Sequence, residues 1–560
     1  MHVERGFRTN KLMSAEEAVA LIGHGDVVTV SGCLGLCLPE KVLTALELRF
    51  MTSGEPAGLT WFDPQYASAG EGQEHFANEG MLKRVIGVTY YYSPEMRRLI
   101  NENKVEGFCM PLGVTHLLLR EIAAKQPGLL TKVGMHTGYD PRYQAGKLNE
   151  ATDEHIVKLL EFEGQEWLFY KSFPINVAII RGTTADEDGN ISVEDEPLTL
   201  FMRYQALAAK AHGGVVIAQV KRVVQRGSIP ARQVEVPGVL VDAIVVDEKQ
   251  AQNESFPERY VFGVDGQYKA KQPPIPILPL DADKIISRRG LLDWRPGQKI
   301  NVGGGVPMYN TTLLALEEGI QDLVTIVVEH GAFGGVNYGS TLHVNPPCLV
   351  SYDTTMTYYL GGLLDSCYFG FAEVDQEGNA NLDRYGDHPG GSGGAVTIEH
   401  ATRRVFILGT LTGGGLKIAT GDGRLRIVQE GRNKRFVQRV PWITFSAKTM
   451  REKEKEVVYI TERAVFRLVA GGLELTEIAP GIDLERDVIA QMGFRPLIAS
   501  DLRMMDDRLF RQESLGLRKA LIGEAFSPPP AACRSFGSGE VFSALSILQD
   551  SQFMAPGGGG

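Results

Sequence analysis

The stretch that decides the fold reads Leu323-Val324-Thr325-Ile326-Val327-Val328-Glu329-His330-Gly331-Ala332-Phe333-Gly334-Gly335. Its first six residues are apolar or β-branched, which predicts a strand buried on both faces, as in a parallel sheet. Ligands of open α/β sheets bind at the carboxyl ends of such strands. Glu329 stands at that end, before glycines that let a ligand approach the backbone. We therefore predict a nucleophile or base, against the simpler interpretation of a surface carboxylate that ends a strand.

The two halves of the chain repeat one pattern. A strand leads into a glycine turn at residues 25–32 and again at 297–304, each time after a helix-like stretch (14–22 and 282–292). The tight-turn sequence Asp-x-(Asp/Glu)-Gly-Asn follows a strand at 186–190 and at 375–379. Strands such as 215–220 and 405–410 alternate with helices such as 200–211. We expect two similar open, mostly parallel α/β units from an internal duplication, with the active site between them.

A proline-rich stretch from Lys271 to Pro279 separates the halves, and such a segment cannot lie inside a helix or a central strand. We predict an N-terminal domain at 1–270, a linker at 271–281 and a C-terminal domain at 282–526 that carries Glu329. The last segment, 527–560, begins Ser-Pro-Pro-Pro and ends in four glycines, so we expect a disordered tail.

Composition excludes several classes of partner. The chain has 560 residues with a net charge of −11, which argues against binding to nucleic-acid phosphates. No apolar run approaches the ~18–20 residues needed to cross a bilayer, and the start does not resemble a secretory signal. The six cysteines are scattered, with neither a disulfide framework nor metal-ligand spacing. We expect a cytoplasmic protein with no metal, membrane or nucleic-acid partner.

Three glycine clusters stand out, at residues 31–40, 302–307 and 389–395, and the first two follow predicted strands. The first two present backbone N–H groups at a strand-to-helix turn, an arrangement that attracts anions. Neither is a complete dinucleotide or P-loop motif. The third cluster is either a mobile surface loop or a set of backbone donors facing a ligand oxygen, as in an oxyanion hole.

With these residues together, the chain resembles the class I CoA-transferases, specifically the single-chain acetate/propionate CoA-transferase branch, related to succinyl-CoA:3-ketoacid CoA-transferases. The resemblance runs from about residue 10 to 526. It rests on residues 328–336, 303–307 and 390–394, supported by 146–150, 371–375, 427–431, 459–466 and 477–481. Two positions depart from the family pattern: His330 stands where a small residue or Asn is usual, and Thr397 where the glycine motif often ends in Asp.

The resemblance implies a role for each candidate residue. Glu329 would be the covalent nucleophile. Gly303, Gly304, Gly305, Gly393 and Gly394 would supply oxyanion or CoA-binding donors, and His330, Gly331 and Gly35 would line the substrate pocket. A glutamate near its reference pKa of ~4.3 is already an anion at neutral pH, so it needs no partner base.

The implied reaction moves CoA from a short-chain acyl-CoA to acetate or another short-chain carboxylate, by a ping-pong mechanism through a glutamyl-CoA thioester. CoA is then a substrate and a covalent intermediate, and no permanently bound cofactor is expected. Acetate, propionate, butyrate and acetoacetate all remain open, because acyl pockets discriminate single methylenes by only about 1–3 kcal/mol. The family also implies a homodimer or homotetramer. The alternatives are an acyl-CoA hydrolase on the same fold and a non-catalytic module that senses a sugar phosphate or CoA.

Overall fold

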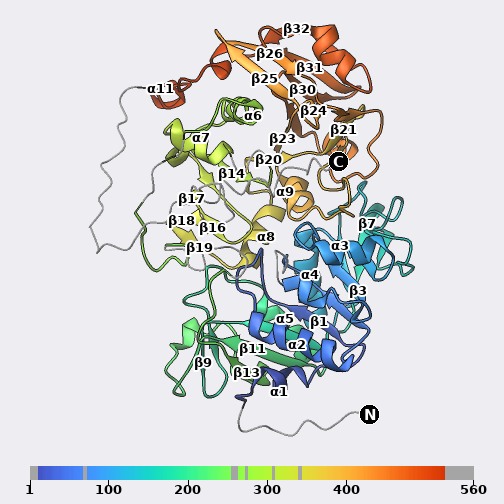
Figure 1. The fold of residues 1–560 in the computed structure, drawn as a ribbon, viewed down its shortest axis with the longest axis vertical. Helices are drawn as coiled ribbons and strands as arrows, with labels where there is room; N and C mark the ends of the chain where they lie inside the picture. Colours follow the sequence, from blue (N-terminus) through green and yellow to red (C-terminus); the bar gives the residue numbers. More distant parts are fainter. Residues whose placement is uncertain are drawn as a thin grey trace.

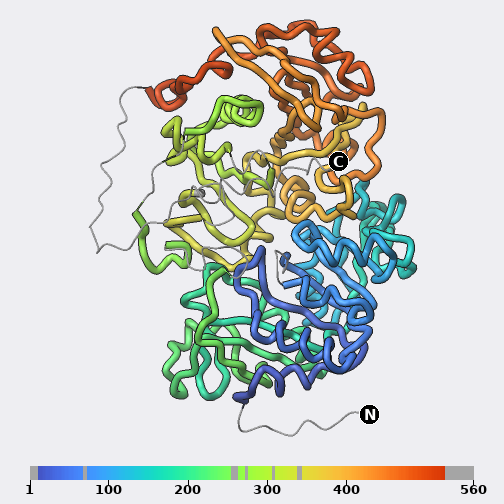
Figure 2. Tube along the Cα trace, viewed as in Figure 1, coloured from blue at the N-terminus to red at the C-terminus, as the bar shows by residue number. Residues whose placement is uncertain are grey.

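The computed structural model describes residues 11–66, 72–253, 263–271, 275, 277–305, 310–337 and 343–523. These residues form two α/β halves that lie one above the other in Figure 1. Figure 2 shows the first half in blue to green and the second in lime to red. The predicted tail at 527–560 and most of the linker prolines lie outside the described residues, so the predicted domain boundaries stay predictions.

The first half is built on a seven-stranded parallel sheet in the order β13-β11-β8-β1-β2-β3-β4. The interior strands β8 and β11 are buried at every position, because helices cover both faces of a parallel sheet. The strands are β1 (Val27–Val30), β2 (Leu59–Phe62), β3 (Leu82–Gly87), β4 (Glu106–Cys109), β8 (Val177–Arg181), β11 (Val215–Val220) and β13 (Ala243–Val246). The helices are α1 (Ala15–Val19), α2 (Glu40–Ser53), α3 (Pro94–Asn101), α4 (Leu112–Ala123) and α5 (Met202–Ala211).

The second half is built on an eight-stranded sheet in the order β15-β14-β20-β23-β29-β30-β31-β32. The first five strands are parallel, whereas β30 pairs antiparallel with both of its neighbours. The strands are β14 (Lys299–Val302), β15 (Thr325–Ile326), β20 (Ser366–Gly370), β23 (Arg404–Leu408), β29 (Glu456–Ile460), β30 (Ala464–Val469), β31 (Gly472–Ile478) and β32 (Leu497–Met504). The helices are α6 (Ala282–Leu291), α7 (Thr312–Glu317), α8 (Tyr352–Leu360), α9 (Ala395–Ala401), α10 (Ala447–Glu452) and α11 (Leu517–Ile522).

Both halves also contain smaller sheets of two or three strands. An antiparallel three-stranded sheet, β5 (Gly128–Thr131), β7 (Gln165–Lys171) and β6 (Val157–Phe162), extends the first half. Other short strands are β9 (Thr184–Asp186), β10 (Ile191–Ser192), β12 (Arg222–Val224), β16 (Ala332–Phe333), β17 (Val336–Asn337), β18 (His343–Val344), β19 (Cys348–Leu349), β21 (Glu373–Asp375), β22 (Ala380–Asn381), β24 (Thr412–Gly413), β25 (Lys417–Gly421), β26 (Arg424–Gln429), β27 (Asn433–Lys434) and β28 (Phe436–Val437).

The two predicted Asp-Gly-Asn turns have the same internal bonds. In the first half, Asp186 Oδ2 accepts a hydrogen bond from Asn190 Nδ2 at 2.9 Å, and the Asn190 backbone N–H donates to Asp186 Oδ1 at 2.9 Å. In the second half the same two bonds join Asn379 to Asp375, at 3.1 and 2.9 Å. The predicted α/β class with mostly parallel sheets is confirmed. Duplication as its origin stays a prediction that these turns support.

Helix α4 of the first half lies against α8 and α9 of the second, at the junction seen in Figure 1. A second contact lies close to it. The Gly138 N–H donates to the Ile443 carbonyl at 2.8 Å, and the Tyr139 ring meets the Trp442 ring edge-on at 5.9 Å. Trp442 and Tyr139 are both fully buried, so the junction is a packed interface. Within the described part of the chain, no helix is long and apolar enough to cross a membrane.

Candidate active site

Glu329 lies in a tight turn at the junction of the two halves. The preceding strand β15 is shorter than predicted: it covers only Thr325–Ile326 and lies at the edge of its sheet, so the expected doubly buried strand at 323–328 is wrong. The chain instead folds back, because Val328 N–H donates to the Ala332 carbonyl at 3.2 Å and Gly331 N–H to the Val328 carbonyl at 3.1 Å. Val327 and Val328 are buried by this turn, which explains their apolar character without a long strand.

Gly331 makes the turn possible. Its φ of +98° is in the region that favours glycine, and a Cβ there would lie 1.9 Å from the Val350 carbonyl oxygen. The Val350 N–H in turn donates to the Gly331 carbonyl at 2.9 Å. The structure therefore gives this predicted pocket residue a backbone-packing role in the turn that carries Glu329.

The third glycine cluster, at residues 389–395, packs against Glu329. A Cβ on Gly394 would lie 2.6 Å from Glu329 Oε1, so only glycine leaves room for the carboxylate. The cluster is also attached to the first half of the chain, where Leu112 N–H donates to the Gly393 carbonyl and Gly393 N–H to the Val88 carbonyl, both at 3.2 Å. The predicted nucleophile and the glycine cluster thus meet where the two halves join.

The predicted backbone donors are not equivalent. Gly303 N–H already donates to the Tyr368 carbonyl at 2.8 Å within the sheet, and Gly393 N–H is bonded to Val88. For either amide to bind a substrate oxygen, its present bond would have to break. Gly304 and Gly305 are exposed at the end of β14. Gly394 lies beside both the phenol of Tyr66 and the carboxylate of Glu329.

Burial raises the pKa of Glu329 above its usual value, because an apolar environment disfavours the charged form. Hydrogen bonds from its own backbone N–H and from the Asn301 side chain oppose this rise. Asn301 is fully buried on β14 and also donates to the Val327 carbonyl at 3.0 Å and to the Tyr359 hydroxyl at 3.2 Å. Asn301 therefore connects the end of β15, where the turn begins, to the carboxylate.

Three tyrosines surround the carboxylate: Tyr66 from the loop after β2, and Tyr352 and Tyr359 from helix α8. Burial raises the pKa of each phenol well above 10, and the negative charge of Glu329 raises it further. All three thus stay protonated and uncharged beside the carboxylate. The sequence analysis missed them, although Tyr352 and Tyr359 are spaced seven apart on one helix face, a signal that could have been noticed.

The first glycine cluster, at residues 31–40, brings Cys33 of the first half next to Glu329. Cys33 is fully buried beside Tyr352 and Glu329, and burial raises the pKa of its thiol well above 9. Gly35, with φ +80°, forms the turn in which Cys33 and Leu36 exchange backbone hydrogen bonds of 2.9 and 2.8 Å. Gly35 thus shapes the loop that presents Cys33. The predicted pocket residue His330 is buried, with its ring 6.0 Å from that of Tyr352.

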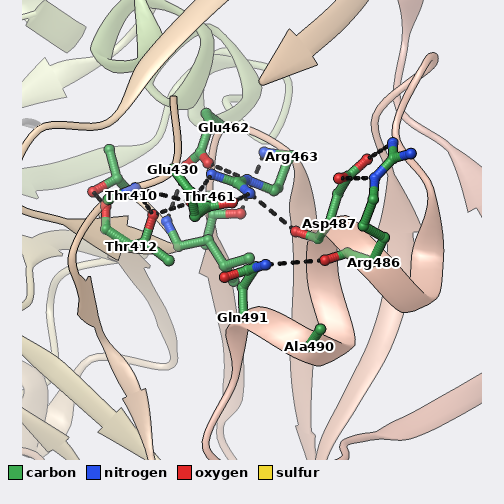
Figure 3. A network of polar contacts seen from close by, with 12 residues as sticks. Thr410, Thr412, Glu430, Thr461, Glu462, Arg463, Arg486, Asp487, Ala490 and Gln491 are labelled. Carbon is green, nitrogen blue, oxygen red and sulfur yellow. Dashed lines mark hydrogen bonds and ion pairs between the residues drawn. The ribbon is translucent and has the colours of Figure 1, made fainter. Parts of the chain in front are cut away.

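Some family-like stretches belong to the scaffold rather than to the site. Arg463 is fully buried after β29 and bonds Glu462 at 2.5 Å and both oxygens of Glu430 at 2.8 and 3.0 Å (Figure 3). It also donates to the Asp487 carbonyl at 3.0 Å. Glu462 Oε2 accepts from the Leu411 N–H at 2.9 Å. This network joins four segments of the second half and accounts for the stretches 427–431 and 459–466.

Comparison with known proteins agrees with this geometry. The family model for coenzyme A transferases matches residues 12–247. The acetate CoA-transferase YdiF of Escherichia coli O157:H7 is 38% identical over 513 residues, covering 90% of this chain and 96% of that protein. The chain belongs to the coenzyme A transferase family. The predicted single-chain class I CoA-transferase is confirmed, and with it an enzyme rather than a sensing module.

Further relatives extend this assignment. The caffeate CoA-transferase of Acetobacterium woodii is 37% identical over 524 residues, covering 90% of this chain and 98% of that protein. The human mitochondrial succinyl-CoA:3-ketoacid coenzyme A transferase 2 is 25% identical over 433 residues, covering 69% of this chain and 77% of that protein. The crystal structure of YdiF apoenzyme superimposes with a TM-score of 0.86, covering 91% of this chain and 98% of that chain at 37% identity. This CoA-transferase thus shares the architecture of a solved family member over 91% of its chain.

Proposed function

We propose that this CoA-transferase moves CoA from a short-chain acyl-CoA to acetate or another short-chain carboxylate, by a ping-pong mechanism through a glutamyl-CoA thioester on Glu329. The observation that carries the proposal is the contact between Glu329 Oε1 and Gly394, at a position where any side chain would collide with the carboxylate. A carboxylate held against a glycine cluster, at the junction of the two halves, is suited to attack a carbonyl carbon that lies between them.

The reaction proceeds in four steps. A Glu329 oxygen attacks the thioester carbonyl carbon and CoA leaves as a thiolate, giving an acyl-glutamyl anhydride. The thiolate attacks the glutamyl carbonyl carbon, which forms the glutamyl-CoA thioester and releases the first carboxylate. An incoming carboxylate attacks this thioester to form a second anhydride and CoA thiolate. The thiolate then attacks the new acyl carbonyl and leaves Glu329 free.

Burial serves this chemistry in two ways. The anhydride and the glutamyl thioester must be kept from water, and a packed junction between two halves excludes it. Each step also passes through an oxyanion, and one well-placed donor is commonly worth about 2.7–4 kcal/mol. Among the predicted donors, the Gly394 N–H lies beside the carboxylate, so we assign it to this task.

The relatives support the reaction class but leave the acid open. One relative is named for acetate and another, of nearly equal identity, for caffeate. A structure of the E. coli O157:H7 enzyme is described as a thioester complex with CoA, and it superimposes on this chain with a TM-score of 0.85 at 37% identity. We retain short-chain acids as the substrates. A panel of acyl-CoA donors and carboxylate acceptors, analysed by ping-pong kinetics, tests that choice. Homo-oligomeric assembly and a cytoplasmic location stay predictions.

Replacing Glu329 by Gln tests the nucleophile. We expect Glu329→Gln to abolish transfer while CoA binding remains, and borohydride to inactivate wild-type enzyme only after exposure to acyl-CoA. The matched control is Glu513→Gln, because Glu513 is exposed and lies in another part of the second half. A CoA-derived mass on the Glu329 peptide supports the proposal. Near-normal turnover of Glu329→Gln, or acyl-CoA loss that needs no carboxylate acceptor, refutes it.

A further inference from the structure

Tyr66 occupies a strained position beside the candidate nucleophile. Its φ is +69°, a backbone conformation that a bulky side chain rarely adopts. The loop is held there because Leu34 N–H, from the first glycine cluster, donates to the Tyr66 carbonyl at 2.9 Å. Strained residues that the surrounding structure keeps in place concentrate at functional sites.

The Tyr66 phenol lies against the same glycine cluster as the carboxylate. Its oxygen is 2.2 Å from the position that a Cβ on Gly393 would take, while the next residue, Gly394, has its Cβ position 2.6 Å from Glu329 Oε1. Two adjacent glycines thus make room for two functional groups, one from each half of the chain. Tyr66 as a whole residue is half-buried at this junction.

The matching topology of the two halves explains why these groups meet. Tyr66 follows β2, which pairs in parallel with β1 at the centre of the first sheet. Glu329 follows β15, which pairs in the same way with β14 in the second sheet. The ends of these two corresponding strands face each other across the junction.

We propose that Tyr66 is a further catalytic residue, whose phenol O–H donates a hydrogen bond to the acyl oxygen while Glu329 attacks the acyl carbon. This inference rests on the proposed function of Glu329. As the new C–O bond forms, the π electron pair of the carbonyl moves onto its oxygen, where Tyr66 stabilises it without transferring its proton. The pair then returns, the C–S bond breaks, and CoA leaves with the bonding electrons as a thiolate.

The environment of Tyr66 suits a hydrogen-bond donor. Burial, together with the charge of Glu329, raises the pKa of this phenol well above 10, so the O–H stays intact at working pH. The backbone of Gly394 beside the phenol opposes this rise in the pKa, but burial outweighs it.

The half-reaction tests this role. Wild-type enzyme and Tyr66→Phe are mixed with acetyl-CoA without an acceptor, quenched, and analysed for the glutamyl-CoA adduct by mass. We expect Tyr66→Phe to form the adduct about 100-fold to 1,000-fold more slowly, as for loss of one oxyanion donor. Its CoA affinity and melting temperature should stay near those of the wild type, because the ring is retained.

Tyr170→Phe is the matched control. It also removes a buried hydroxyl, which donates to the Val133 carbonyl at 3.0 Å, but from β7 of the separate three-stranded sheet. Its adduct should form at the wild-type rate. Adduct formation by Tyr66→Phe at the wild-type rate, or a fall that only follows weaker CoA binding or lower stability, overturns the role of Tyr66 alone. If the wild type forms no adduct on Glu329, the proposed function fails as well.

Discussion

Thr397 on α9 bonds directly to Gly113 on α4, and this pair joins the two halves of the molecule. The Thr397 hydroxyl oxygen accepts a hydrogen bond from the Gly113 N–H at 2.9 Å. A Cβ on Gly113 would lie 2.4 Å from the Thr397 methyl group, so the pair is complementary in shape as well. Thr397, one of the two residues at which this chain departs from the family pattern, thus binds an N–H in the first turn of a helix. That N–H otherwise has no partner within the helix.

Gly113→Ala should therefore force the halves apart next to Glu329. We expect a loss of about 1–3 kcal/mol in stability from overpacking and a fall in transfer rate of about tenfold or more, because small displacements of reacting groups are costly. Thr397→Ser removes the methyl group and keeps the hydroxyl. The double variant Gly113→Ala/Thr397→Ser should therefore regain most of the lost stability and most of the lost transfer rate. A double variant no better than Gly113→Ala would contradict this account of the contact.

The acid limb of the pH–rate profile should report the ionisation of Glu329. Only its ionised form attacks, and burial raises its pKa, so kcat should fall with decreasing pH at a value above the usual 4.5. Asn301→Ala removes a hydrogen bond that opposes the rise and should move this limb to still higher pH. Asn149→Ala, which removes a half-buried amide that bonds Ile100 and Val105 in the first half, serves as control. If the acid limb of Asn301→Ala lies at the same pH as that of wild type, Asn301 does not stabilise the ionised Glu329.

The same shift predicts that Glu329 destabilises the fold at neutral pH. A carboxyl whose folded pKa is raised stabilises the fold fully below its unfolded pKa, and this contribution is lost as the pH rises through the folded pKa. We expect Glu329→Gln to melt at a higher temperature than wild type at pH 7.5, with a smaller difference near pH 4.5. A lower melting temperature of the variant at pH 7.5 would show that burial of the ionised carboxylate does not destabilise the fold.

Local patterns allowed much of the fold to be predicted from the sequence. Strand β11 and helix α5 lie within one or two residues of their predicted bounds, because a buried parallel strand and an amphipathic helix have distinct periodicities. Both Asp-Gly-Asn turns formed as expected because their bonds are local. The stretch 323–328 misled because a buried hairpin turn and a buried strand have the same apolar composition.

The site could be predicted only in part. Glu329 and Gly394, which the structure brings together, could both be proposed from the sequence, because glycines and a carboxylate stand out there. Tyr66 was missed because its partner, Gly393, lies in the other half, and no local pattern shows how two halves pack. Asn301 was missed because one amide within a strand is unremarkable until the strand's neighbours are known.

His75 should make stability depend on pH between about 6.5 and 9. It lies between Glu40 and Glu47 of α2, at 2.7 and 2.6 Å; burial alone would lower its pKa, but these bonds outweigh burial and raise the pKa to about 9. A raised pKa stabilises the fold below the unfolded value of 6.5, and this contribution, about 3 kcal/mol, disappears as the pH rises through 9. The melting temperature of wild type should fall over this range, whereas that of His75→Gln should change less. His24→Gln, in an exposed pair with Glu55, should behave like wild type.

Arg463 should be required for stability and not for chemistry. It is fully buried and pairs with Glu462, also fully buried, and with Glu430, in a network away from Glu329. Arg463→Met leaves both carboxylates without their partner, and loss of one member of a buried pair costs about 3–5 kcal/mol. The variant should melt at a much lower temperature, yet retain wild-type kcat per folded molecule at low temperature. Arg495→Met, in an exposed pair with Glu485, should melt within a degree or so of wild type. If folded Arg463→Met instead loses kcat, the network also acts on the active site and is not only part of the scaffold.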